Sequence, residues 1–344
     1  MSVIHRVRLP VGASPLVEVG HEVQPAEVLA TRRPPGEGTS VAVAASLRRS
    51  PAATADCLSA QPGSVLEAGD LLAADGRGRE VRVPRASLFL GYDPDEGSAL
   101  MAPLLGTEPI VGHVRGEVTR VDPEAIEIRV AGALVPGVGG SGGAVHGELR
   151  LAVREPGDEL RAGAIDVGTT GRILVGGSRA SAETLTRARA MGVAGIVLGG
   201  IRDKELRDFE ATQLRRREIG GERGDFAVLL IEGFGKVGLD PGLFAWFRAH
   251  DGHVASLFGD SAQLYVYDAG APPARRALPR TGDRVIAHRR PYAGLGGELL
   301  RIVPGLHATA AGIPVRAGVV RFEDGLTAVV PLANLEAAEP APAG

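Results

Sequence analysis

The chain has 344 residues, enough for two or three domains, and its 38 lysines and arginines nearly balance its 41 aspartates and glutamates. The net charge of −3 excludes a globally basic nucleic-acid-binding protein and an acidic tail protein. Hydrophobic residues make up 44% of the chain, which excludes wholesale disorder, and 49 glycines with 24 prolines predict many turns and short strands.

The single cysteine, Cys57, excludes an internal disulfide and a cysteine-based zinc site. No histidine stands near it in a catalytic pattern, so we expect an inert side chain. The first residues contain no apolar segment of the length a secretory signal needs, and the apolar run at 226–231 is far too short to span a bilayer. These observations predict a cytoplasmic protein that does not associate with a membrane.

Two stretches of the N-terminal third repeat one pattern. HEVQPAEVLA and SVLEAGDLLA contain V-x-x-A-x-x-L-A at 23–30 and L-x-x-G-x-x-L-A at 66–73. Each predicts a short strand, a tight turn at the small residue and a second short strand. The repeat resembles the half-motif of barrel-sandwich hybrid domains, the biotinyl/lipoyl-like fold. Carrier members of that fold attach the cofactor to a lysine, and no lysine precedes Lys204, so we expect neither covalent biotin nor covalent lipoate.

The remainder of this part, which we place at residues 1–160, is also expected to be rich in β-strand. Residues 31–56 show no sustained period and predict an inserted loop. Strands are predicted over 81–92, 109–121 and 125–132, and the last of these alternates apolar with charged residues as a half-buried strand does.

Residues 137–147 read GVGGSGGAVHG, in which Gly137, Gly139 and Gly142 have the spacing G-x-G-x-x-G. A dinucleotide-binding fingerprint needs a helix directly afterwards, and the alternating residues that follow predict a strand instead. We therefore expect a sharply turning loop at 137–143. His146 has no second ligand at metal spacing, so it does not indicate a metal site.

Residues 163–262 differ in character, because continuously apolar segments alternate with amphipathic ones. Gly192 is expected to end the first helix, and Asp240 and Pro241 to begin the third. The pattern predicts a small parallel sheet with helices on both faces, a three-layer α/β domain. Its strands are expected at 171–177, 194–200, 226–233 and 253–259, and its helices at 181–192, 203–221 and 240–252.

Three glycine-bearing loops follow these strands, at 176–180, 199–203 and 232–236. Ligands of parallel α/β sheets bind at the carboxyl ends of the strands, and a helix that begins at Ser181 would offer free N–H groups to a phosphate. The alternative is that the glycines only permit tight turns. The candidate ligand-binding residues are Ser178, Arg179, Arg202, Glu232 and Lys236.

Catalytic and metal-binding signatures are weak or missing in the sequence. Residues 176–180 approach the G-x-S-x-G nucleophile elbow but end in alanine, and His250 and His253 follow no convincing acid-then-histidine order. P-loop, H-E-x-x-H, C-x-x-C and calcium-loop patterns do not occur. We therefore expect no catalytic residue, no metal and no cofactor. The basic run 215–217, with Arg223, is expected to be a solvated helix end.

Residues 280–336 carry the most specific resemblance. RTGDRVIAHRRPYAGLGGELLRI contains Gly282-Asp283-x-Val285 and then Tyr292-x-Gly294-x-x-Gly297-x-Leu299, and VVRFEDGLTAVVPLANLE follows after a turn. This resembles a KOW-type SH3-like barrel, the module of ribosomal proteins and NusG-like transcription factors, with its hairpin, closing strand and 3₁₀ turn. The resemblance would assign RNA contacts to Arg289, Arg290 and Arg301. Residues 337–344 are expected to form a disordered tail.

The sequence as a whole predicts a multidomain α+β protein: a barrel-sandwich-like part, a small α/β domain and a C-terminal SH3-like barrel. With no catalytic constellation, the leading hypothesis is a non-enzymatic interaction or assembly module with a protein partner. The first alternative is a KOW-mediated RNA-binding or transcription/translation-associated factor. From Ala271 onward nine arginines meet six acidic residues, and this small surplus predicts weak binding of RNA. The second alternative is an enzyme or sensor that binds a small anionic ligand at the α/β loops.

Overall fold

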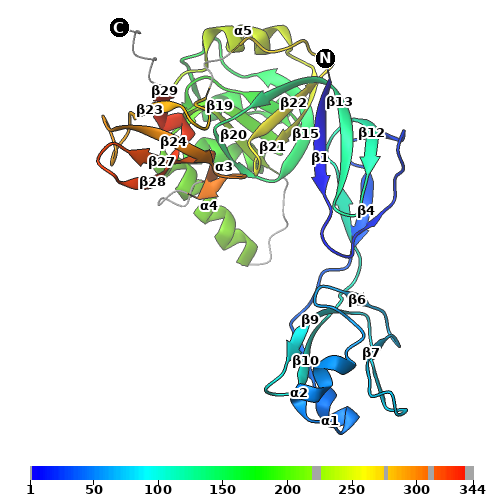
Figure 1. Ribbon diagram of the computed structural model, residues 1–344. Coiled ribbons are helices and arrows are strands. Elements are labelled where there is room, and N and C mark those ends of the chain that lie inside the picture. Colours follow the sequence, from blue (N-terminus) through cyan, green and yellow to red (C-terminus); the bar gives the residue numbers. More distant parts are fainter. Residues whose placement is uncertain (1, 219–225, 275–277, 309–313, 338–344) are drawn as a thin grey trace. The chain divides into compact units, whose positions relative to one another are not determined.

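The computed structural model describes residues 2–218, 226–274, 278–308 and 314–337. The protein is rich in β-strand and contains a curled, half-barrel sheet (Figure 1). The chain forms two compact units, one of residues 1–4, 113–116 and 129–344, the other of residues 5–112 and 117–128. Within the described residues, none of the helices combines the length and the apolar character that crossing a membrane requires.

The central sheet of the larger unit is mixed. Four of its strands run parallel, namely β15 (Ala144–Leu151), β17 (Ile173–Val175), β19 (Gly195–Ile201) and β20 (Ala227–Phe234). Beyond β15 the sheet continues antiparallel through β21 (Val254–Phe258), β22 (Gln263–Tyr267) and the second half of β13 (Ala125–Pro136). Beyond β20 it continues antiparallel through β14 (Gly139–Gly142), β26 (Pro314–Val315) and β25 (His307–Ala308).

This sheet departs from the expectation in two ways. The strand expected to be the fourth parallel one, over 253–259, is β21, and it runs antiparallel to β15. The boundary expected near residue 160 falls inside the sheet, because β15 pairs with β17. An apolar run carries no information about the direction of its partner, and an upstream strand occupies the parallel position here.

Three helices pack against the sheet close to their expected ranges: α3 (Ala182–Ala190), α4 (Asp203–Glu218) and α5 (Pro241–Ala249). The Asp240 carboxylate caps α5 as expected, since its Oδ1 accepts from the N–H of Leu243 at 2.9 Å. Because successive strand residues point to opposite faces, Val197 packs in a core with α5 while Ile196 packs in a second core with α3 and α4. The basic side chains at 215–217 and 223 lie outside the described residues.

The glycine run expected to be a loop at 137–143 contains a strand, β14, so that expectation is wrong. A Cβ on Gly140 would stand 2.4 Å from the Gly259 carbonyl oxygen and 2.7 Å from that of Val228. Glycine is rare in strands, and the run therefore resembles a loop in sequence. Here the missing side chain lets neighbouring backbone approach on both sides.

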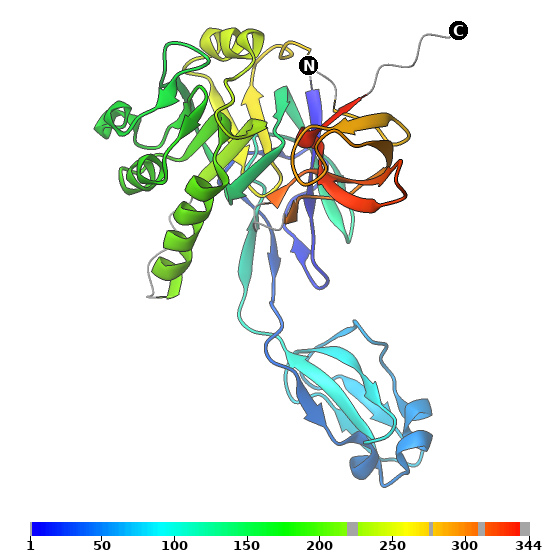
Figure 2. The same cartoon turned by 90° about the vertical axis from the view of Figure 1, so that its left-hand side faces the viewer.

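The last part of the chain forms a five-stranded antiparallel sheet of order β28-β27-β24-β23-β29, drawn in orange and red in Figure 2. The 3₁₀ turn η4 (Leu332–Asn334) lies between β28 and β29, and Phe322 lies in the core of the sheet. The expected tail falls outside the described residues from 338 onward. The strands are β23 (Arg284–Ala287), β24 (Gly296–Ile302), β27 (Ala317–Phe322), β28 (Thr327–Pro331) and β29 (Leu335–Ala337).

The smaller unit consists of short strands. Three of them form a sheet, β2 (Ser14–Pro15), β4 (Val28–Arg32) and β11 (Glu108–Val111). Four form another, β5 (Thr39–Val41), β10 (Ser98–Pro103), β9 (Ser87–Asp93) and β6 (Val65–Leu66). The hairpin of β7 (Leu71–Ala74) with β8 (Glu80–Arg82) is separate, and β1 (Ser2–Arg8), β12 (Gly116–Val121) and β3 (Glu22–Val23) belong to the ladder that includes β13.

The inserted loop expected at 31–56 is structured instead. It contains β5 and the helices α1 (Val43–Leu47) and α2 (Pro51–Thr54), which the 3₁₀ turn η1 (Ala55–Cys57) follows. Val43 and Leu47, four residues apart on one face of α1, are fully buried with Leu72 and Phe89. A helix of five residues is too short to show a period in the sequence.

One turn recurs in both units. In each copy a carboxylate accepts from the backbone N–H three residues before it, and its own backbone N–H donates to that residue's carbonyl. The N–H to carboxylate distances lie between 2.7 and 3.0 Å. Two copies lie in the predicted strand–turn–strand repeats, and two were not expected. The four turns are Gln24–Glu27, Glu67–Asp70, Glu155–Asp158 and Arg280–Asp283.

Gly140→Ala should destabilise the protein by about 1–3 kcal/mol, because the added methyl group would displace the backbone of a neighbouring strand. The matched control is Gly143→Ala, where a Cβ would meet no atom within 4 Å. Urea unfolding of both variants measures the difference in the free energy of unfolding. Equal stability of the two variants would show that β14 does not need the close approach.

Candidate functional site

Protein backbone fills the glycine loops that were one candidate site for an anion, so these glycines fit the alternative in which they only permit tight turns. A Cβ on Gly177 would stand 2.4 Å from the Asp158 carbonyl oxygen, and a Cβ on Gly199 would stand 2.4 Å from that of Val237. Ser178 is buried, and its backbone N–H donates to the Asp158 carbonyl at 2.7 Å. These glycines allow one loop to pack on another, and Ser178 does not face an open cavity.

The N-terminus of α3, expected to offer free N–H groups, is occupied by the protein's own side chains. Ser181 Oγ accepts from the N–H of Thr184 at 3.1 Å, and Glu205 Oε2 on α4 accepts from the N–H of Ala182 at 2.8 Å. A carboxylate at this position also satisfies the positive end of the helix dipole. A phosphate would have to displace both groups.

The remaining sequence candidates are dispersed. Arg179, on the short strand β18 (Arg179–Ala180), pairs with Glu159 at 3.0 Å. Glu232 lies on β20, and its Oε1 is 3.4 Å from the backbone nitrogen of Asp240. Lys236 and Arg301 are exposed, and the structure does not bring them together with the other candidates.

Arg202, Arg289 and Arg290 do come together, at a cleft of about 610 Å³ that we call the arginine cleft. Its lining comes from the ends of β19 and β20, from the segment between β23 and β24, from the strands β25 to β28 and from the turn η4. The volume lies within the ~300–1,000 Å³ of small-molecule sites. The lining comprises Arg202, Asp203, Phe234, Gly235, Arg289, Arg290, Pro291, Tyr292, His307, Val315, Ala317, Val329, Val330, Pro331 and Asn334.

The three guanidinium groups of the arginine cleft are exposed and have no carboxylate partner among the described residues. Elsewhere in the same unit arginines commonly pair: Arg284 lies 2.6 Å from Glu323, and Arg321 lies 2.7 Å from Glu298. Asp203 is the one carboxylate among the described lining residues. Three like charges around one hollow repel one another, and a bound anion would relieve that repulsion.

The rest of the arginine cleft is apolar and aromatic. Phe234 and Tyr292 both line it and are half-buried. The Tyr292 ring stacks on Phe322 with centroids 5.1 Å apart and planes at 27°, and Phe322 is buried in the core of the sheet. Tyr292 is therefore held in place from behind. The sequence analysis assigned neither ring to a binding site. Aromatic residues are only 4% of this chain, and this scarcity was a signal that could have pointed to them.

A second cleft of about 750 Å³, which we call the proline cleft, is lined by Pro136, Pro272, Pro273 and Pro279 among others. Its charged groups are balanced, since Arg280, Arg316 and His288 are accompanied by Glu232 and Glu336. His288 Nε2 lies 2.6 Å from the Glu336 carboxylate. This cleft is larger than the arginine cleft but has no excess of one charge that would select a ligand.

The histidines considered for a hydrolase lie in an aromatic cluster at the C-terminal end of α5. The His250 ring lies 4.3 Å from that of Trp246 and 4.9 Å from that of His253. His250 Nδ1 is 2.7 Å from the Trp246 carbonyl oxygen, which holds the ring in place. Within the described part of the chain, no three histidine, cysteine or acidic side chains gather as metal ligands would.

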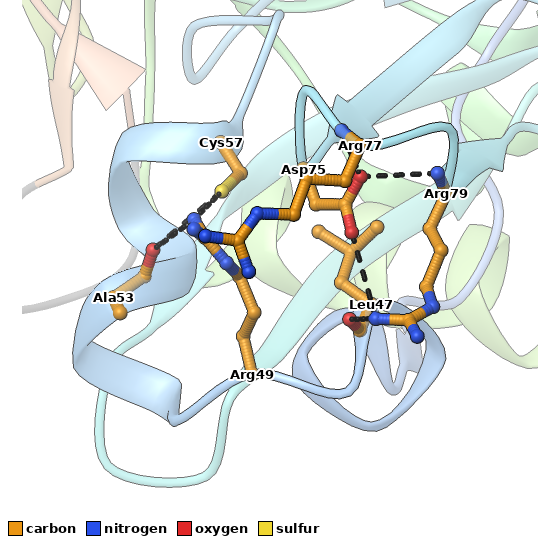
Figure 3. Close-up of polar contacts among 7 residues, drawn as sticks. All are labelled: Leu47, Arg49, Ala53, Cys57, Asp75, Arg77 and Arg79. Carbon is orange, nitrogen blue, oxygen red and sulfur yellow. Dashed lines mark hydrogen bonds and ion pairs between the residues drawn. The ribbon is translucent and has the colours of Figure 1, made fainter.

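Cys57 lies in a polar cluster of the smaller unit (Figure 3). The thiol, nearly buried, donates to the Ala53 carbonyl at 3.5 Å and accepts from Arg49 Nη1 at 2.9 Å. Asp75 accepts from the backbone N–H groups of Arg77 at 2.7 Å and Arg79 at 3.0 Å. These two N–H groups lower the pKa of Asp75, and the charges of Arg79 and Arg49 lower it further. These contacts give the Cys57 thiol and the Asp75 carboxylate hydrogen-bond partners within the fold.

No protein-family model matches the chain, and no curated protein is significantly similar to it in sequence.

Asp75→Asn should destabilise the smaller unit at neutral pH, and the difference from wild type should disappear as the pH falls. The folded-state pKa of Asp75 lies below its ordinary value of 3.8, so its stabilisation is present above that value and is lost below it. Thermal unfolding from neutral pH to below pH 3 measures the difference. Asp95→Asn, at an exposed position of the same unit, is the control. A loss of stability in Asp75→Asn that stays constant with pH would contradict the stabilising role of the ionised Asp75 carboxylate.

Proposed function

We propose that the protein binds a small anionic ligand in the arginine cleft, as a sensor or ligand-carrying module. The observation that carries the proposal is the convergence of Arg202, Arg289 and Arg290 on one hollow, where the described residues include no carboxylate partner for them. Guanidinium groups donate in a fork that matches phosphate and carboxylate oxygens. The sequence assigned Arg202 to an anion at the α/β loops, and it assigned Arg289 and Arg290 to RNA at the C-terminal sheet. In the structure these three residues line the same cleft.

We also propose the three-part domain organisation that the sequence predicts. The strand–turn–strand repeats β3–β4 and β6–β7 support a part related to barrel-sandwich hybrid domains. The two cores on opposite faces of the parallel strands support a three-layer α/β part. The five-stranded order with η4 before the last strand supports an SH3-like part resembling KOW modules.

Removal of any one cleft arginine should weaken anion binding about tenfold or more, because a charge-assisted hydrogen bond contributes ~1.5–3 kcal/mol. The variants are Arg202→Ala, Arg289→Ala and Arg290→Ala, with tripolyphosphate as the probe in calorimetric titration at low salt. The matched control is Arg321→Ala, whose guanidinium pairs with Glu298 and does not line the cleft. Wild-type protein that binds no tripolyphosphate, or an equal loss in the control, would overturn the proposal.

A second candidate function is docking of a protein partner on the smaller unit. Leu90 on β9 and Leu100 on β10 are 42% and 45% exposed, and a Cβ on Gly38 would stand within 3.7 Å of a methyl group of each. The two leucine side chains therefore lie together over Gly38 on one face of the sheet. Exposed apolar side chains that gather on one face mark interaction sites more often than scattered ones do.

Leu90→Glu with Leu100→Glu should abolish recovery of a stoichiometric partner from nuclease-treated native lysate, because a charge would have to be buried at the contact. Leu326→Glu, at a leucine 45% exposed in the other unit, is the matched control. Mass spectrometry of the recovered material compares the three proteins. A partner retained by the double variant, or lost equally from the control, would rule out this sheet face.

A further inference from the structure

We infer that the ligand of the arginine cleft is a nucleotide, with its base between the apolar walls and its phosphates on the arginines. The inference rests on the proposed function and adds the class of ligand. A site for inorganic phosphate alone would require only the cationic side chains. The cleft is also lined by two aromatic residues, by several apolar residues and by an asparagine whose side-chain amide has no hydrogen-bond partner among the described residues, and these suit a planar base.

The two aromatic residues of the cleft come from segments far apart in the chain. Phe234 ends β20, and Tyr292 belongs to the segment between β23 and β24. Tyr292 stacks on the buried Phe322 ring, which fixes its plane before any ligand enters. Every base has a π-face, so base–aromatic stacking recognises nucleotides as a class.

The apolar wall and the amide complete a site for a base. Val315, Ala317, Val329 and Val330 line the cleft from β26, β27 and β28. Asn334 lines it too, and its side-chain amide makes no hydrogen bond with any residue in the described part of the chain. An amide offers one acceptor and two donors, which match the hydrogen-bonding edge of a base.

The charges have an arrangement suited to phosphate groups. Arg289 and Arg290 are consecutive and lie in the same segment as Tyr292, between β23 and β24, while Arg202 and Asp203 lie at the start of α4. Cations from two segments of the chain can share the oxygens of one phosphate chain, whereas a single carboxylate ligand has too few oxygens to pair with all three arginines. A hollow of about 610 Å³ favours one nucleotide over a nucleic-acid strand.

The test compares ATP and GTP with tripolyphosphate and ribose 5-phosphate in calorimetric titrations. We expect at least one nucleotide to bind about fivefold to 150-fold more tightly than tripolyphosphate, which is the gain that stacking of one base gives. Tyr292→Leu and Phe234→Leu should each remove that gain and leave tripolyphosphate binding unchanged. Retained tripolyphosphate binding also shows that a variant is folded. Asn334→Ala should change the preference between ATP and GTP.

The outcomes separate the two proposals. Equal affinity for tripolyphosphate and nucleotides would overturn the nucleotide inference and leave the anion site standing. No binding of any of these anions would overturn both. Binding of a short RNA strand without binding of ATP or GTP would show that the ligand is a nucleic-acid strand and would overturn the nucleotide inference. Unchanged nucleotide affinity in both ring variants, together with tight RNA binding, would lead to the same conclusion.

Discussion

The arginine cleft depends on close contact between two backbone segments at Gly199 and Gly200. A Cβ on Gly200 would stand 2.8 Å from the Gly235 carbonyl oxygen, and Gly235 N–H donates to the Ile201 carbonyl at 2.7 Å. This contact holds the end of β20, with Phe234, beside the end of β19, with Arg202. Gly199 and Gly200, which the sequence suggested as part of a ligand site, therefore act through backbone packing that holds the two strand ends together. The side chains that line the cleft belong to residues that follow them.

Much of the fold could be predicted from local signals. Asp240 with Pro241 marked the start of α5, and the spacing of small and apolar residues marked the strand–turn–strand repeats. Two kinds of feature could not be predicted. Gly139–Gly142 forms a strand because neighbouring backbone needs the space, and a sequence gives no account of neighbouring backbone. The short helices at 43–54 take their stability from tertiary burial, since they are too brief to be stable alone.

The candidate site shows the same division. Arg202, Arg289 and Arg290 were each suspected from sequence, but for different ligands, because their convergence requires the C-terminal sheet to pack beside the end of β19. Ser178 was suspected for its position after a glycine pair, and it is buried because the Glu155–Asp158 turn covers it. That turn had a readable signal: a carboxylate three residues after the chain enters the turn, preceded by a small residue, as in the two repeats already recognised.

The walls of the arginine cleft come from segments that are far apart in the chain, and this has a consequence for how the protein is made. Arg202 and Phe234 emerge from the ribosome well before Tyr292 and Asn334. Contacts between distant segments form late, because the chain between them must first lose its freedom. The cleft is therefore among the last features to mature, and occupancy by a ligand would select those molecules in which the C-terminal sheet has already docked.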